Sequence, residues 1–213
     1  MDEHTQVQER LLMRNIGARY GVTIAAACKM TDVRESFVAA LVANESGGDA
    51  TAKRFEHGVL NSLWDVLMGR KANYGSIGAV NLYAYLTLPP EDRGSTFESM
   101  QDSLRKLDGL ATSWGLTQIM GYEILDQKLT GQMGLFPSIM QTPEVSIRYT
   151  NVMLLQIARA KNLRVDANFD ELFDCWNTGR PHAPTADPQY IPNGLERMKI
   201  YAQLAAGDTD PGT

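Results

Sequence analysis

Glu45 is the residue whose type and position are best suited to chemistry. It follows Val38 by seven positions and Leu41 by four, so in a helix it shares a face with these apolar side chains. A carboxylate on a buried face is costly unless it is paired or protonated, and the last turn of a helix disfavours a further negative charge. Both effects raise the pKa of a carboxyl. Glu45 is therefore a candidate general acid, although a glutamate that faces water at a frayed helix end has the same spacing.

Five short motifs occur in order along the chain. They read ESGG at 45–48, SWGLTQIM at 113–120, LF at 135–136 followed by PEVSIR at 143–148, CWNTG at 175–179 and YIPNGLERM at 190–198. In this order they resemble the ES-G, G-L-M-Q-I-M, LFDPEVNIR, A-Y-N-A-G and closing Y-V-x-x-V motifs of the soluble lytic transglycosylase and goose-type lysozyme family. The resemblance rests on the ordered set, which spans about residues 35–205.

The resemblance implies a mainly α, lysozyme-like single globular domain that cleaves the β-1,4 bond between N-acetylmuramic acid and N-acetylglucosamine in peptidoglycan. Glu45 aligns with the family's catalytic acid, which protonates the glycosidic oxygen. In a lytic transglycosylase the same carboxylate then acts as a base while the sugar's own 6-hydroxyl attacks C1. The product is a 1,6-anhydro sugar, and the 2-acetamido group assists, so one carboxylate suffices. No cofactor is implied.

Further positions carry over from the same motifs. Ser46, Gly115, Gln118, Asn177 and Tyr190 are expected to line the cleft and contact the glycan. Each has an ordinary structural alternative. Ser46 and Asn177 suit helix ends, Gln118 suits the solvated face of a short helix, Gly115 suits a helix start, and Tyr190 suits the core.

Two features depart from the family pattern. Trp176 stands where the family has a cleft tyrosine, and an indole offers one N–H donor and no acceptor. Another residue must therefore orient Glu45 if the family geometry holds. The second departure is an insertion of about residues 52–112, which makes the distance from Glu45 to Gly115 70 positions. Its aromatic residues suit either a cleft wall or a core of the insertion's own.

The insertion keeps two other functions open. A hydrolytic muramidase needs a second carboxylate, typically about 6.5–9.5 Å from the acid, to activate water. Asp49, Glu56 and Asp65 are the candidates by proximity in sequence. The other alternative is a non-catalytic peptidoglycan-binding protein on the same fold.

Apolar periodicity is helical along almost the whole chain, with little strand-like alternation. We expect helices to about 20, then over 24–30, 35–45, 59–69, 77–87, 96–107, 115–126, 142–161, 169–178 and 189–206. Gly47-Gly48 and Gly179 are expected terminators, and Thr142-Pro143 is an expected helix start. The predicted organisation is an N-terminal helical segment 1–34, a catalytic domain 35–206 and a flexible tail 207–213.

Composition narrows the partners. The 213 residues are 44% hydrophobic and 21% charged, as in a globular protein. With 20 Lys+Arg against 25 Asp+Glu the net charge is −5, which disfavours nucleic acid or a membrane surface as the main partner. Peptidoglycan glycan strands are the expected partner, and the chain is expected to be a monomer. Cys28 and Cys175 are expected to be buried thiols or a single disulfide, and no metal-binding motif occurs.

The N-terminus is acidic where a signal peptide is basic, and no apolar h-region follows. The resemblance implies action on the bacterial cell wall, in the periplasm or outside the cell. We therefore expect a protein that stays cytoplasmic until it is released, or one whose leader has been removed.

Overall fold

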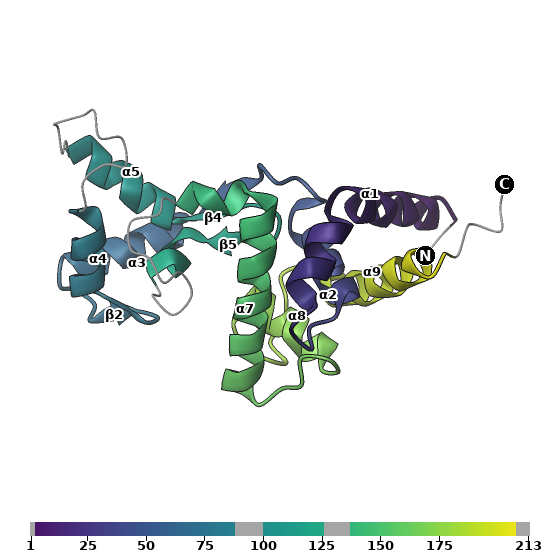
Figure 1. Cartoon of the computed structure of the whole chain (residues 1–213). Coiled ribbons are helices and arrows are strands. Elements are labelled where there is room, and N and C mark those ends of the chain that lie inside the picture. Colours follow the sequence, from purple (N-terminus) through teal and green to yellow (C-terminus); the bar gives the residue numbers. More distant parts are fainter. Residues whose placement is uncertain (1–2, 88–99, 126–136, 208–213) are drawn as a thin grey trace.

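A computed structural model of the chain describes residues 3–87, 100–125 and 137–207, which form a mainly helical protein with two lobes (Figure 1). The helical lobe contains α1 (Glu3–Cys28), α2 (Glu35–Ser46), α8 (Phe169–Thr178) and α9 (Tyr190–Ala205). The sheet lobe contains α3 (His57–Leu67), α4 (Ala79–Leu86), α5 (Met100–Leu110) and the strands of the described chain. Between them stands α7 (Pro143–Lys161), which contributes side chains to the cores of both lobes.

The helix that carries Glu45 is enclosed on all sides. Every residue of α2 from Phe37 to Ala43 is at most 5% exposed, because α1, α7, α8 and α9 all contribute to the core around it. The sequence predicted a single apolar stripe, whereas a helix that is apolar all round is typical of a core position. Its predicted end is confirmed, since Gly47 and Gly48 adopt left-handed conformations with φ of 61° and 84°.

The predicted break near residue 20 is wrong, because α1 is one continuous helix. Its two glycines are places of close approach and not terminators. A Cβ at Gly17 or Gly21 would lie 3.6 or 3.5 Å from the Tyr201 side chain of α9. Helix α1, in the predicted segment 1–34, packs in one core with α2 of the predicted domain 35–206.

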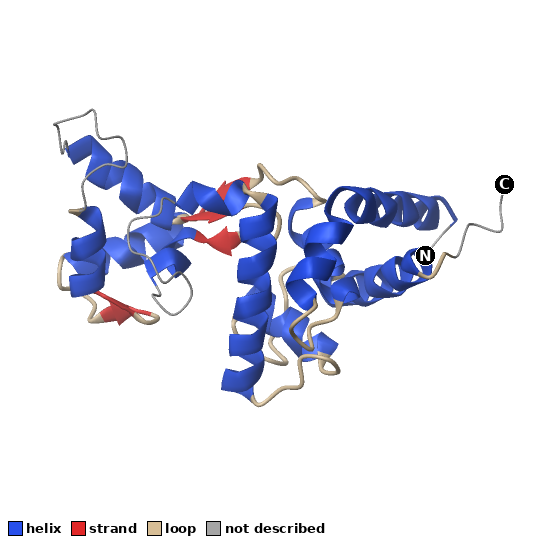
Figure 2. Ribbon diagram, in the orientation of Figure 1, coloured by secondary structure: helices blue, strands red, loops and turns tan. Residues whose placement is uncertain are grey.

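A small antiparallel sheet brings together three short segments between residues 53 and 120. Strand β1 (Lys53–Phe55) pairs with β4 (Thr112–Trp114), and β4 pairs with β5 (Ile119–Met120), as Figure 2 shows in red. The β1–β4 pair brings together the two ends of the predicted insertion 52–112. Between these ends lie α3, α4, α5 and a small hairpin of β2 (Asn73–Tyr74) with β3 (Ile77–Gly78). The core of the sheet lobe includes Leu63, Val66, Leu82 and Leu110 from this range, together with Tyr149 of α7.

The helix expected over 115–126 is wrong. Residues 115–118 form the loop between β4 and β5, and the 3₁₀ helix η1 (Gly121–Leu125) follows. Gly115 and Gln118 have φ of 76° and 51°, and a right-handed helix cannot contain such residues. A second 3₁₀ helix, η2 (Pro137–Gln141), precedes α7.

The other helices in the described residues lie close to their expected ranges. α7 begins at Pro143 and α8 ends before Gly179, which has a φ of 78°. Residues 96–99, Leu135, Phe136 and the tail 208–213 lie outside the described residues. Cys28 and Cys175 are both free and buried. None of the described helices has the length and hydrophobicity that a membrane span requires.

Candidate active site

Glu45 lies in the last turn of α2 with its side chain half-buried. Its Oε1 accepts a hydrogen bond from the Tyr190 hydroxyl at the start of α9. No described residue donates a hydrogen bond to Oε2. One oxygen is thus held by the protein, and the other is left for a proton.

Burial raises the pKa of the Glu45 carboxyl above its ordinary value. The Tyr190 hydrogen bond and the positive charge of Arg54 act in the opposite direction and lower it, but burial dominates. The pKa of the Tyr190 phenol is raised as well, first by burial and then by the neighbouring Glu45 charge. The phenol therefore remains a proton donor to Glu45 at neutral pH. A carboxyl with a raised pKa that is held by a fixed donor can act as a general acid.

Tyr190 is buried, whereas a side chain that contacts the glycan is expected to be exposed in the cleft. Tyr190 is 8% exposed, and its ring lies edge-on to Phe173 with centroids 6.0 Å apart. Its hydroxyl is committed to Glu45. Tyr190 thus supplies the orienting contact that Trp176 cannot. Sequence reasoning missed this role, because nothing in the spacing relates two residues 145 positions apart.

Ser46 connects the end of α2 to the sheet lobe. Its hydroxyl donates to the Leu116 carbonyl at 2.7 Å and accepts from the Gly48 N–H at 3.2 Å. The Thr117 hydroxyl, in the same loop, lies 2.7 Å from that of Thr150 in α7. The 115–118 loop is therefore fixed to two helices, α2 and α7. In this structure the hydrogen bonds of the Ser46 hydroxyl are to backbone groups of the protein.

Gly115 and Gln118 are also held by contacts within the protein. A Cβ at Gly115 would lie 1.9 Å from the Met140 carbonyl oxygen, so the close approach of η2 requires glycine. The Gln118 amide donates to the Gly115 carbonyl at 3.0 Å and accepts from the Ser113 hydroxyl at 2.8 Å. Both residues shape the loop that Ser46 holds.

Trp176 contacts both lobes. Its ring packs against the cores of the helical and sheet lobes, and its indole N–H donates to the Thr117 carbonyl at 3.3 Å. Trp176 thus places a large apolar ring where the lobes meet. Trp176 has no hydrogen bond to Glu45.

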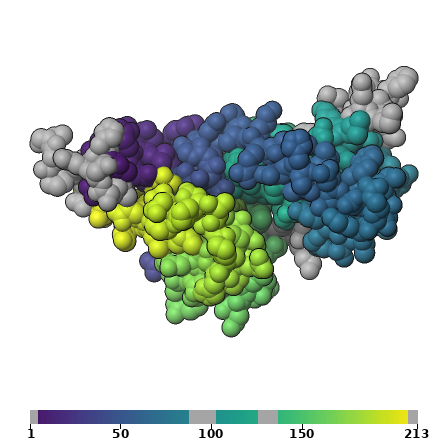
Figure 3. Space-filling model, turned by 180° about the vertical axis from the view of Figure 1, so that it is seen from behind, coloured from purple at the N-terminus to yellow at the C-terminus, as the bar shows by residue number. Residues whose placement is uncertain are grey.

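A hollow of about 540 Å³ lies between the lobes, on the side of the loop where Gln118 and Asn177 are found. Its aromatic walls include Tyr74 and Tyr122, whose rings meet edge to face 5.4 Å apart, and Trp176. Figure 3 shows the two lobes side by side, with the sheet lobe in blue and teal and α8 and α9 in green to yellow. The structure brings Gln118 and Asn177 together here, whereas Glu45 does not line this hollow. Its volume is in the range of small-molecule sites.

The three candidates for a second carboxylate are engaged by neighbours close in sequence. Asp49 accepts from the N–H and the hydroxyl of Thr51, at 2.8 Å each. Asp65 pairs with Arg70 at 2.8 Å and Lys71 at 3.5 Å. These contacts hold the pKa of Asp49 and Asp65 below the ordinary value.

Glu56 forms an ion pair with Arg54, and the Arg54 charge also acts on Glu45. Glu56 is thus the one of the three that shares a charged neighbour with the acid. The Arg54 side chain is 73% exposed, so this pair contributes little to stability.

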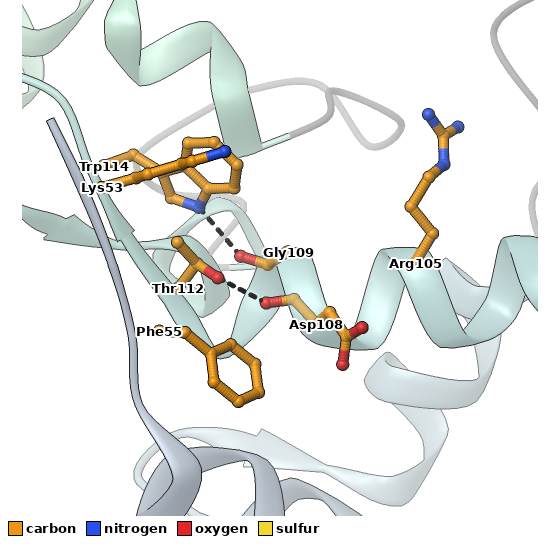
Figure 4. Close-up of a pocket in the computed structure, with 7 residues that line it drawn as sticks. All are labelled: Lys53, Phe55, Arg105, Asp108, Gly109, Thr112 and Trp114. Carbon is orange, nitrogen blue, oxygen red and sulfur yellow. Dashed lines mark hydrogen bonds between the residues drawn. The ribbon is translucent and has the colours of Figure 1, made fainter. Parts of the chain in front are cut away.

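A second hollow, of about 510 Å³, lies on the other face of the sheet. Lys53, Phe55, Thr112 and Trp114 line it from β1 and β4, as Figure 4 shows, together with part of α5. Side chains alternate along a strand, so these four point away from the face of Arg54 and Ser113. The Trp114 indole and the Thr112 hydroxyl both donate to α5 carbonyls.

No group of His, Cys, Asp and Glu side chains within the described ranges is arranged to hold a metal ion. No protein-family model, curated protein or solved structure matches this chain significantly.

Proposed function

We propose that this protein is a peptidoglycan-cleaving glycosidase with a lysozyme-like fold, and that it is a lytic transglycosylase in which Glu45 is the only catalytic carboxyl. The observation that carries the proposal is the half-buried Glu45 carboxyl, with a raised pKa and one oxygen held by Tyr190. The ordered motif resemblance supplies the substrate class, a glycan strand with a β-1,4 bond between N-acetylmuramic acid and N-acetylglucosamine. The enzyme would act on the cell wall as a monomer.

In the proposed reaction, protonated Glu45 donates its proton from Oε2 to the glycosidic oxygen, and the bond from that oxygen to C1 breaks. The 2-acetamido group stabilises the positive charge that develops at C1. The carboxylate then accepts the proton of the 6-hydroxyl as its oxygen bonds to C1. The proton returns to Glu45, and no water is consumed. Tyr190 keeps the carboxyl in one orientation throughout, because its hydroxyl can donate to Oε1 in either protonation state.

The hollow that Gln118 and Asn177 line supports a glycan as the ligand. Aromatic rings and amide groups are the side chains that contact the apolar face and the polar edge of a sugar ring. In the proposal, part of the strand occupies this hollow and the scissile bond lies at Glu45, across the 115–118 loop.

A second candidate is a hydrolytic muramidase that uses Glu56 to activate water. It is favoured by one observation: Glu56 forms an ion pair with Arg54, and the positive charge of Arg54 also lowers the pKa of Glu45. A non-catalytic glycan-binding protein is the third possibility, and it predicts binding without bond cleavage.

The test is mass spectrometry of the muropeptides that the purified protein releases from peptidoglycan, beside the Glu45→Gln variant. The proposal expects 1,6-anhydro products, lighter than hydrolysed ones by one water, and a loss of roughly 10²–10⁴-fold in the variant. Reducing-end products would support the hydrolase and direct attention to Glu56. Binding without release from several wall types would support the binding protein, and normal cleavage by Glu45→Gln would exclude Glu45 as the acid.

A further inference from the structure

A partly buried ion pair connects the N-terminal helix to α9. The Glu9 carboxylate of α1 accepts two hydrogen bonds from the Arg197 guanidinium of α9, at 2.6 Å from Nε and 2.8 Å from Nη2. The side chains are only 17% and 14% exposed. Two parallel bonds of this kind fix the plane of the guanidinium.

The same guanidinium is connected to Glu45 by a series of hydrogen bonds. Its Nη1 donates to the Asn44 Oδ1 at 2.7 Å, and the Asn44 Nδ2 donates to the Tyr190 carbonyl at 2.9 Å. Tyr190 in turn donates its hydroxyl to Glu45. Both ends of the Asn44 amide are therefore used, and the chain of contacts runs from α1 through α9 and α2 to the acid.

A second set of contacts from α1 holds the turn just after Glu45. The Arg19 guanidinium and the Tyr20 hydroxyl both donate to the Gly48 carbonyl, at 3.1 and 2.9 Å. A Cβ at Gly48 would lie 3.2 Å from Ile16. Helix α1 thus contacts Gly48 after the acid directly and reaches Asn44 before it through Arg197 of α9.

We propose that the Glu9–Arg197 pair is a positioning device for the Glu45 carboxyl, acting through Asn44 and the first turn of α9. This inference rests on the proposed function for its kinetic consequence only. Neither residue has a contact with Glu45, so neither is catalytic. A pair that served only to hold α1 against α9 would affect stability and leave the acid unchanged.

Among the described residues, few other charged or titratable groups lie near Glu45 or near the Glu9–Arg197 pair. Tyr190 of α9 and Arg54 of β1 act on Glu45. Arg10 lies next to Glu9 and donates to Gln203, while Glu196 and Lys199 flank Arg197 and pair with each other. None of these groups is altered in the test, so a change in Glu45 reports on the chain of contacts.

The test is the titration of the Glu45 side-chain carboxyl, followed by ¹³C NMR in the full-length protein. The double variant Glu9→Gln/Arg197→Gln removes both charges and leaves neither one buried alone. We expect the pKa of Glu45 to move upward, because a looser Tyr190 hydroxyl stabilises the carboxylate less. The matched control is Arg164→Gln/Asp166→Asn, which removes an exposed pair and should leave the titration unchanged. A double variant with lowered Tm and an unchanged Glu45 titration overturns the proposal.

Asn44→Ala provides a second variant that keeps the ion pair and interrupts the chain in the middle. It should shift the titration in the same direction, and an unchanged titration would also overturn the proposal, even if the double variant fails to fold. In muropeptide release, both variants should lower kcat by about tenfold with KM little changed, because small misplacements of a catalytic group are costly. A shifted titration in a wild-type protein that releases no muropeptides would reject the proposed function while retaining the positioning role.

Discussion

Glu45 in the helical lobe and the three candidates for a second carboxylate near and within the sheet lobe are held in opposite ways. In the helical lobe, Glu45 is half-buried, and its orientation depends on Tyr190, a residue far away in the sequence. Near and within the sheet lobe, Asp49, Glu56 and Asp65 are paired with residues two to six positions away. Local pairing keeps a carboxylate ionised and needs no tertiary structure. A carboxyl that is to carry a proton near neutral pH needs burial and a fixed donor, which only distant segments supply.

The largest expected effect on stability comes from the loop that joins the lobes. Gly115→Ala should lower the free energy of unfolding by about 3 kcal/mol or more, because the new Cβ meets the Met140 carbonyl and the φ of 76° is strained for alanine. Urea denaturation measures this. The control is Gly58→Ala in α3, where a Cβ meets nothing within 4 Å and no loss is expected. Equal stability of the two variants would mean that the loop is not held as described.

The next effect concerns the donor to the acid. Tyr190→Phe keeps the ring in the core and removes the hydroxyl, so the fold should be retained while kcat falls about tenfold. The pKa of Glu45 should rise, because a bond that stabilises the carboxylate is lost. Because the proposed reaction needs protonated Glu45, the alkaline limb of the pH–rate profile should move to higher pH. A limb that stays in place would contradict the orienting role, and Tyr83→Phe on the exposed surface of α4 is the control.

A smaller effect is expected on the pH dependence of stability, which the Glu45 carboxyl influences. The raised pKa of Glu45 means that the folded protein binds more protons than the unfolded chain above the ordinary carboxyl pKa, so stability falls as pH rises through that window. Glu45→Gln removes this penalty. Its Tm should exceed that of the wild type by a few degrees at pH 7, and the difference should vanish below about pH 4, where both forms are neutral. A lower Tm at pH 7 would argue against a carboxyl that is costly to ionise.

The smallest effects are expected at the exposed carboxylates. Asp49→Asn, Glu56→Gln and Asp65→Asn should each leave muropeptide release within about twofold of the wild type and stability within about 0.5 kcal/mol. Activity assays and thermal melting measure both. A loss of cleavage confined to Glu56→Gln, with Tm unchanged, would favour the hydrolytic candidate and weaken the contrast between the lobes.

Much of the helical architecture could be predicted from the sequence. Gly47, Pro143 and Gly179 mark helix ends because their backbone preferences are local properties. Gly17 and Gly21 misled the prediction, since they serve packing against Tyr201 and not termination. The 115–118 loop was mistaken for a helix because its positive φ values depend on the β4–β5 pairing and on the approach of η2.

The sequence alone determined the candidate acid, because apolar spacing and a following Gly-Gly are enough to place Glu45 on a buried face at a helix end. It also predicted an insertion over about residues 52–112, and the β1–β4 pair brings residues at the two ends of that range together. Only the tertiary structure decided that Tyr190 orients the acid, that Trp176 joins the two cores and that α1 reaches Asn44 through Glu9 and Arg197. These contacts link residues from 59 to 188 positions apart, and no local preference of the chain specifies them.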